Sequence, residues 1–287
     1  MSAIKKLNDI LNLTSIDEKT FTVSAKEPGW RRIFGGLIVA QAIMAAYKTV
    51  EQKQLHSLHS YFLRAGDPDI PIIYKVKKLR DGNSFVQRIV SSYQNNHLIF
   101  YMMASFHKTE EGLIHQDPMP SDIKDPSTLK NEIELLNETF KNNPKNVRDT
   151  RNRERPIEFR PVNPKNIIRT EKEEPEQLIW LRAADKIEVT LPLSQAILAY
   201  ASDYTILDTA LMPHALSIFQ RDLQVASLDH SIWFHRPFDI NQWLLYSQRS
   251  PTTYGNRGFA TGHIFSHNGD LLATIVQEGM IRLLHNN

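Results

Sequence analysis

Residues 35–47 read GGLIVAQAIMAAY, an apolar run that is interrupted only by Gln41. The run predicts a helix over residues 34–50 with apolar side chains on nearly every face, and such a helix must be buried on all sides. Because the run is shorter than the ~20 residues that cross a bilayer, no membrane insertion is expected. A strongly curved antiparallel sheet wrapped around one helix would bury it.

The same order of predicted elements occurs twice along the chain, with a turn at a Gly-Asn pair in each copy. In each half a helix precedes four strands. The first half has the helix 34–50 and strands 56–64, 70–79, 84–93 and 98–106; the second has a helix 193–209 and strands 227–238, 243–250, 258–265 and 271–280.

Identical residues support a duplication. A shift of about 172 residues aligns the halves, and turns and apolar runs fall in register. It pairs Phe62 with Phe234, Arg64 with Arg236, Tyr74 with Tyr246, Gly82 with Gly255, Asn83 with Asn256, Asn95 with Asn268 and Leu98 with Leu271.

The duplicated pattern predicts an α+β fold of the double hotdog type. In it, each of two repeats has a curved antiparallel sheet wrapped around a central helix, and the two sheets pair edge to edge. The segment between the halves is rich in Pro, Asn and charge. We expect an N-terminal repeat over residues 1–110, a linker with a short helix near 131–140 over residues 111–150, and a C-terminal repeat over residues 151–287 that carries the catalytic residues.

Composition excludes several classes of function. The 34 basic and 32 acidic residues nearly balance, so no broad basic field for nucleic acid is expected. The absence of cysteine removes thiolate nucleophiles, zinc-cysteine sites and iron-sulfur clusters, and agrees with a cytoplasmic location. The histidines form no convincing metal set, so no metal or cofactor is expected. The N-terminal MSAIKKLNDILNL predicts a short surface helix rather than a signal peptide.

Asp229, His230 and Ser231 resemble a hydrolytic triad written in consecutive residues. The aromatic and β-branched residues around them predict a strand, on which neighbouring side chains point to opposite faces. His230 is therefore expected on one face, and Asp229 and Ser231 on the other. A nucleophile and its base must lie within about 3 Å, so we interpret the histidine as part of a hydrogen-bonding framework.

Asp203 lies within the second predicted helix, off its apolar stripe but with apolar residues three and four positions away. A carboxylate in such surroundings needs hydrogen bonds or a raised pKa, and both are features of catalytic sites. The alternative is that Asp203 faces solvent or a loop.

Two further polar residues have weaker signals. Gln277 lies in the last strand, where the first half has Ala104, which indicates that the halves differ in role. Ser227 begins a predicted strand and could orient a water molecule. Alternatively, Gln277 is an exposed edge residue and Ser227 bonds only to backbone.

Gly35 and Gly36 begin the first buried helix, where unpaired N–H groups could hold a carbonyl oxygen or a phosphate. The glycines could equally serve only close packing at the start of the helix. Neither a Walker A motif nor GxGxxG nor GxSxG is present, which counts against nucleotide hydrolysis, dinucleotide binding and an α/β-hydrolase.

Several stretches, in order and over nearly the whole chain apart from the linker, resemble the acyl-CoA thioesterase II family. These are FGGLIVAQAI, LHSLHSYFLRAGD, IPIIYKVKKLRDGNSF, IFYMMASF, AILAYASDYTIL, LDHSIWFHRPF, NRGFATGHIF and VQEGMIR. The resemblance implies hydrolysis of fatty acyl-CoA to free acid and coenzyme A. It also implies a water-binding catalytic group of Asp203, Ser227 and Gln277, with Ser227 standing where bacterial members have threonine.

On this hypothesis Asp203 orients and deprotonates the attacking water. Arg257, and less directly Arg64 or Arg236, could meet the phosphates of coenzyme A.

Two rival hypotheses assume the same fold but a different function. One is an enoyl-CoA hydratase, which usually pairs an aspartate with a histidine; the nearest histidine after Asp203 is His214. The other is a non-catalytic acyl-CoA sensor. An exposed sheet face makes a homo-oligomer plausible.

Overall fold

A computed structural model describes residues 2–24, 32–139, 155–164, 169–218, 220 and 222–284. The N-terminal half contains the first apolar helix and four long strands, preceded by a short helix and two short strands. These elements are α1 (Ala3–Leu11), β1 (Thr14–Ser15), β2 (Thr20–Val23), α2 (Gly35–Tyr47), β3 (Gln54–Phe62), β4 (Ile72–Asp81), β5 (Phe85–Gln94) and β6 (His97–His107).

The C-terminal half repeats the helix and the strands after the linker. The linker contains η1 (Pro126–Thr128) and α3 (Glu132–Thr139). The elements of the C-terminal half are β7 (Ile157–Pro161), β8 (Glu176–Ala183), α5 (Leu191–Ser202), α6 (Asp208–Leu211), η3 (Met212–His214), β9 (Leu223–Ser227), β10 (Asp229–Phe234), β11 (Leu244–Tyr254), β12 (Arg257–Ser266) and β13 (Leu271–Leu283).

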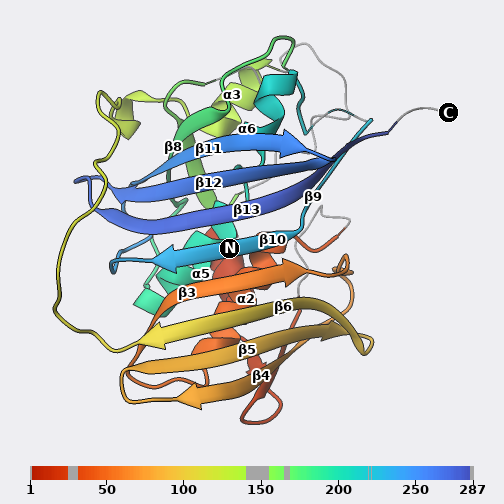
Figure 1. Cartoon of the computed structure of the whole chain (residues 1–287), viewed down its shortest axis with the longest axis vertical. Helices are drawn as coiled ribbons and strands as arrows, with labels where there is room; N and C mark the ends of the chain where they lie inside the picture. The colour runs from red at the N-terminus through yellow and green to blue at the C-terminus, as the bar shows by residue number, and fades with distance from the viewer. Residues whose placement is uncertain are drawn as a thin grey trace.

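All strands in the described residues belong to one antiparallel sheet, in which the two halves join where β3 pairs with β10 (Figure 1). Helices α2 and α5 pack against each other on one face of this sheet. At the junction His59 lies opposite Ser231, and these two positions are 172 residues apart. An approximate two-fold axis therefore passes between them, and the predicted double hotdog architecture is confirmed.

Equivalent arginines show how closely the halves correspond. Arg64 Nη1 donates to the carbonyl of Leu98 at 2.7 Å, and Arg236 Nη1 donates to the carbonyl of Leu271, also at 2.7 Å. These are two of the residue pairs that the sequence alignment of the halves predicted. In each repeat the arginine thus links the segment that follows the first long strand to the last strand by a hydrogen bond.

Helix α2 is buried as its composition requires. Ten of its residues, Gly36 to Ile43 with Ala45 and Ala46, are buried. The polar Gln41 has a partner at each end of its amide, since its Nε2 donates to the Ile10 carbonyl at 2.8 Å and its Oε1 accepts from the Tyr74 hydroxyl at 2.6 Å. Within the described residues no helix is long and apolar enough to span a membrane.

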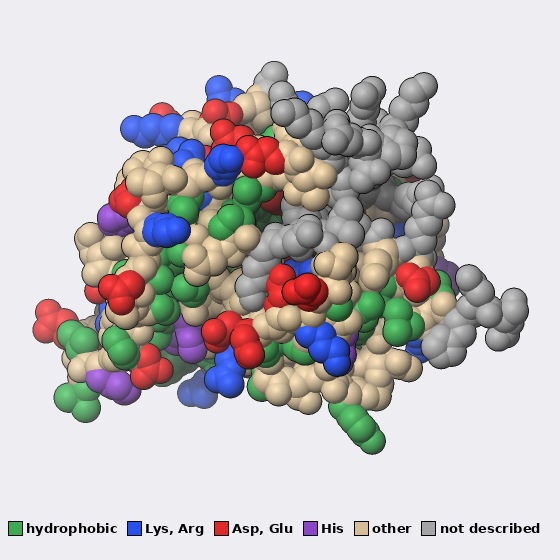
Figure 2. All heavy atoms as spheres, turned by 90° about the horizontal axis from the view of Figure 1, so that it is seen from above, with side chains coloured by type: hydrophobic (Ala, Val, Ile, Leu, Met, Phe, Trp, Pro, Cys, Tyr) green, Lys and Arg blue, Asp and Glu red, His purple; other side chains and the backbone are tan. Residues whose placement is uncertain are grey.

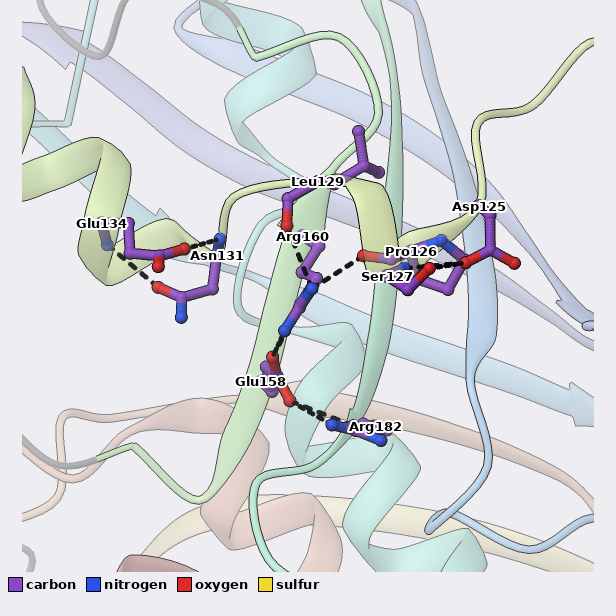
Figure 3. A network of polar contacts seen from close by, with 9 residues as sticks. All are labelled: Asp125, Pro126, Ser127, Leu129, Asn131, Glu134, Glu158, Arg160 and Arg182. Atoms are coloured by element: carbon purple, nitrogen blue, oxygen red, sulfur yellow. Dashed lines mark hydrogen bonds and ion pairs between the residues drawn. The ribbon is translucent and has the colours of Figure 1, made fainter.

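The linker crosses the C-terminal half and is fixed to it by polar contacts (Figure 3). Asn131 and Glu134 form a reciprocal cap at the start of α3, with N–H to side-chain distances of 2.7 and 2.9 Å. Arg160 of β7 donates from Nη1 to the carbonyls of Pro126 and Leu129 at 2.8 and 3.0 Å. The short helix predicted near residues 131–140 is α3; residue 140 lies outside the described residues.

Strands β7 and β8 were not predicted, because charged residues obscure their apolar pattern. Glu158 in β7 accepts from Arg160 of the same strand at 2.7 Å and from Arg182 of β8 at 3.0 Å, so these charges pair within β7 and across to β8 (Figure 3). Acidic and basic side chains are also interspersed over the face seen from above in Figure 1 (Figure 2).

The single strand predicted over residues 227–238 is wrong, because the chain breaks at Leu228 into β9 and β10. Ser227 and Ser231 are four residues apart, whereas their partners on β13, Gly279 and Val276, are three apart. One extra residue is therefore accommodated, as in a β-bulge. The Asp229 carboxylate accepts a hydrogen bond from the Glu278 N–H at 2.7 Å. This backbone donor of β13 therefore has an acceptor at the point where β9 ends and β10 begins.

The helix predicted over residues 193–209 is also too long. Helix α5 ends at Ser202, and the Tyr204 N–H donates to the Ala201 carbonyl three residues back at 3.1 Å. Further bonds of this tighter type lead into α6. The break leaves Asp203 as the C-cap of α5 rather than in the middle of a helix.

Candidate active site

The structure brings Asp203, Ser227 and Gln277 together from three different elements. Gln277 on β13 donates from Nε2 to Asp203 Oδ1 and to Ser227 Oγ, each at 2.7 Å. Ser227 at the end of β9 donates from Oγ to Asp203 Oδ1 at 3.0 Å. Asp203 Oδ1 thus accepts two hydrogen bonds, and among the described residues no side chain donates to its Oδ2.

The bulge at Leu228 places Ser227 in this cluster. On a regular strand Ser227 and His230 would point to opposite faces, since they are three positions apart. The extra residue brings both side chains to the face covered by α5, where one contacts Asp203 and the other contacts Gln277.

Asp203 occupies an unfavourable place for a negative charge. Its exposed fraction is only 8%, and burial raises the pKa of its carboxyl. His230 and the hydrogen bonds from Gln277, Ser227 and the Gly36 N–H lower that pKa in part. The C-terminal end of α5 also carries the negative pole of the helix. A carboxylate whose proton affinity is raised in this way suits a general base near neutral pH.

The glycine pair at the start of α2 also lies at this carboxylate. A Cβ on Gly35 would stand 2.7 Å from Asp203 Oδ2, and one on Gly36 would stand 2.5 Å from the Tyr200 carbonyl oxygen. Contacts this short leave no room for a side chain at either position. The two glycines therefore let the N-terminus of α2 approach the C-terminus of α5, and the Gly36 N–H is hydrogen-bonded to Asp203.

Arg257 does not join the cluster. Its Nε donates to Glu278 Oε1 at 2.9 Å. Glu278 follows Gln277 on β13, so its side chain points to the opposite face of the sheet. About half of the Arg257 side chain is exposed, at the turn between β11 and β12.

His230 is the member of the site that the sequence did not identify. It is fully buried, with Nδ1 at 2.6 Å from Gln277 Oε1 and Nε2 at 2.9 Å from Ser202 Oγ. Burial lowers the pKa of the imidazole, although Asp203, Gln277 and Asp229 raise it in part. Strand alternation predicted only that His230 lies on the face opposite to Asp229 and Ser231, and no local pattern indicated which residues it would meet.

The consecutive Asp229, His230 and Ser231 are not a triad. Ser231 Oγ lies 3.2 Å from His59 Nδ1 across the strand junction, and Asp229 bonds the backbone of Glu278. In the part of the chain that the structure describes, no group of three His, Asp or Glu side chains could hold a metal ion.

Comparisons with known proteins cover nearly all of the chain. The family described as acyl-CoA thioesterase matches residues 147–280, and the one described as acyl-CoA thioesterase N-terminal domain matches residues 26–107. Acyl-CoA thioesterase 2 of Haemophilus influenzae is 39% identical over 97% of this chain and 98% of its own length. Acyl-coenzyme A thioesterase 8 of Homo sapiens is 38% identical over 96% of this chain and 88% of its own length.

Solved structures show the same correspondence. The crystal structure of acyl-CoA thioesterase II TesB2 from Mycobacterium marinum is 35% identical, with a TM-score of 0.78 over 96% of this chain and 98% of that one. A tesB protein of Mycobacterium avium subspecies paratuberculosis is 26% identical, with a TM-score of 0.80 over 97% of this chain and 99% of that one.

Proposed function

The chain belongs to the acyl-CoA thioesterase family and is a thioester hydrolase, and on that premise we propose that it hydrolyses fatty acyl-CoA through a water molecule activated by Asp203. The observation that carries this proposal is the buried carboxylate of Asp203, to which both Ser227 and Gln277 donate. Their donation to Oδ1 leaves Oδ2 as the oxygen that takes a proton from water.

In the proposed reaction Asp203 accepts a proton as the water oxygen attacks the thioester carbonyl. The tetrahedral intermediate then collapses, the carbon–sulfur bond breaks, and the proton is returned to the coenzyme A thiolate. The products are the free acid and coenzyme A. No cofactor takes part in the proposed reaction.

The oxyanion of the intermediate needs a hydrogen-bond donor. Helix geometry leaves the first N–H groups of α2 without intrahelical acceptors. The Gly36 N–H donates to Asp203, so we assign the Gly35 N–H to the oxyanion. The proximity of Gly35 to Asp203 Oδ2 supports this role.

We also propose that Arg257 contacts a phosphate of coenzyme A at the rim of the site. It lies opposite Met280 on β13, three residues along that strand from Gln277. The ion pair with the half-buried Glu278 engages Nε, and Nη1 has a long contact of 3.5 Å with the Gly255 carbonyl, so Nη2 points to a role in binding a ligand. A charge reversal, Arg257→Glu, should raise KM for acyl-CoA with little change in kcat.

We further propose a cytoplasmic location and a homo-oligomeric state. The absence of cysteine agrees with the first. Exposed Tyr61, Tyr101 and Met103 on neighbouring strands of the sheet support the second.

Release of free thiol from acyl-CoAs of varied chain length tests the proposed reaction. Asp203→Asn should lower kcat by roughly 10³-fold, the range of a lost general base. Asp229→Asn is a matched control, because it alters a nearby carboxylate yet keeps the oxygen that accepts the Glu278 N–H. It should retain activity within about twofold.

Other outcomes would select a rival function. Loss of enoyl absorbance without thiol release would identify a hydratase, and tight acyl-CoA binding without turnover would identify a sensor. Full activity of Asp203→Asn would remove the catalytic assignment.

A further inference from the structure

We propose that His230 is a positioning residue that fixes the amide orientation of Gln277 and thereby keeps two donors directed at Asp203 and Ser227. This inference rests on the proposed function and extends it to a residue without contact to the reacting atoms. The hydrogen bonds of His230 lead to Asp203 through Gln277 and through Ser202, the residue before Asp203.

The hydrogen bonds of Gln277 require one particular amide orientation. A glutamine side chain has one acceptor oxygen and two N–H donors. Both donors of Gln277 are used, one by Asp203 Oδ1 and one by Ser227 Oγ. A half turn of the amide would place its oxygen against Asp203 Oδ1, so that two acceptors would face each other.

His230 selects the productive orientation only if its Nδ1 carries a proton. In that tautomer Nδ1–H donates to Gln277 Oε1, which lies 2.6 Å away. If Nδ1 were unprotonated, it would attract the amide NH₂ group and turn the donors away from the carboxylate. The position of one proton on a buried ring thus controls the hydrogen bonds to the proposed base.

Ser202 can complete this arrangement. Its Oγ lies 2.9 Å from His230 Nε2 and 3.1 Å from the Ala199 carbonyl, and in the tautomer with a proton on Nδ1 its single proton goes to Nε2. Burial lowers the pKa of His230, which keeps the ring neutral at physiological pH. The titratable groups around it are Asp203 at the end of α5, Asp229 on β10 and Tyr246 on β11, whose hydroxyl donates to the Ser202 carbonyl at 3.1 Å.

The N-terminal half shows that a histidine is not needed to build this strand pair. The positions equivalent to His230 and Gln277 are Leu58 and Ala104, which lie opposite each other on β3 and β6. Both are buried in the core. An apolar pair therefore packs at this place in the fold, and the polar pair in the other half serves the neighbouring carboxylate.

A pair of substitutions separates positioning from packing. His230→Asn keeps an N–H donor near the Nδ1 position but loses ring volume, whereas His230→Leu keeps volume and removes the donor. Positioning predicts that Leu lowers kcat roughly 100-fold, as a displaced catalytic group does, with KM within about twofold. Asn should retain at least about tenfold more activity than Leu. The acid limb of kcat/KM should also move to higher pH in the Leu variant, because Asp203 loses a donor to its charged form.

A packing role predicts the reverse order, with Leu more active than Asn, and that result would overturn the proposal. Thermal unfolding of both variants controls for folding. Nitrogen-15 NMR of the wild-type imidazole gives an independent test that does not depend on the activity of any variant, once the His230 signal is assigned by its absence in His230→Asn. A proton on Nε2 and none on Nδ1 at neutral pH would also overturn it.

The same experiments distinguish this inference from the proposed function. If Asp203→Asn is inactive and His230→Leu is as active as wild type, the catalytic assignment stands and the role of His230 fails. If Asp203→Asn is fully active, the catalytic assignment fails whatever His230→Leu does.

Discussion

The two halves of the molecule place different chemistry at equivalent positions. In the C-terminal half, the end of α5 presents Asp203 to Ser227. In the N-terminal half, the end of α2 presents Tyr47, whose hydroxyl donates to Gln195 Oε1 at 2.5 Å and accepts from the Leu55 N–H at 2.8 Å. Leu55 and Ser227 are 172 residues apart, and each lies beside an irregularity in its strand.

On the proposed function, only one half of the duplicated fold carries the base. Burial of a carboxylate is unfavourable, and unfavourable groups of this kind are concentrated at functional sites. At the second location a phenol replaces it, and burial raises the pKa of Tyr47 to about 12, so the group stays neutral. A cavity of about 240 Å³ still lies there, lined in part by Leu55, Gln195 and Arg236, but it has no equivalent of Asp203.

Two separate substitutions, at the equivalent residues Gln277 and Ala104, would test the comparison between the halves most strongly. Gln277→Ala removes both donors that converge on Asp203 and Ser227, so kcat should fall roughly 10²–10³-fold in the thiol-release assay. Ala104→Gln would instead bury an amide opposite Leu58 without partners, which should lower the free energy of unfolding by about 3 kcal/mol in a denaturant titration. Equal loss of activity in the two folded variants would contradict a functional difference between the halves.

Gly35→Ala would test the contact between the helix ends. The added Cβ would meet Asp203 Oδ2 at 2.7 Å and must displace it or the Phe62 ring. Activity should fall roughly 100-fold, because small displacements at a reacting group have large effects on rate. Gly112→Ala is the matched control, since a Cβ there meets nothing within 4 Å, and should retain full activity.

Ser227→Ala should have a smaller effect on rate and a diagnostic effect on pH dependence. Loss of one hydrogen bond to a carboxylate should lower kcat roughly tenfold. Burial already raises the pKa of Asp203, and the Ser227 donor opposes that rise. Its removal disfavours the charged form, so the acid limb of kcat/KM should move to higher pH. Ser227→Thr should restore both quantities, and a downward shift of the limb in the Ala variant would contradict the assignment.

Tyr47→Phe should have the smallest effect on activity. It removes the hydroxyl that bonds Gln195 and Leu55, which should lower the free energy of unfolding by about 2 kcal/mol. Because this location lacks the proposed base, thiol release should stay within about twofold of wild type. A large kcat loss in a folded Tyr47→Phe protein would show that the second location also takes part in turnover.

Local patterns in the sequence were sufficient for the architecture. An all-round apolar helix, alternating strands and paired Gly-Asn turns each constrain the chain within a few residues, so they predicted the duplicated halves. Charged strands such as β7 did not follow those patterns, because Glu158 is paired by residues on the same and the neighbouring strand. The resemblance to a family, rather than any local pattern, named Asp203, Ser227 and Gln277 as a group.

Only the tertiary structure decided how the polar groups meet. The hydrogen bonds of the site join residues 24, 50 and 74 positions apart, and these separations follow no helix or strand period. An extra residue at Leu228 turned Ser227 toward Asp203, and the early end of α5 left that carboxylate at a helix terminus. The sequence determined where apolar surface must be buried, since that depends on local periodicity. The pairing of buried donors with acceptors depends instead on how distant elements pack. Such packing brings His230 within hydrogen-bond distance of Gln277.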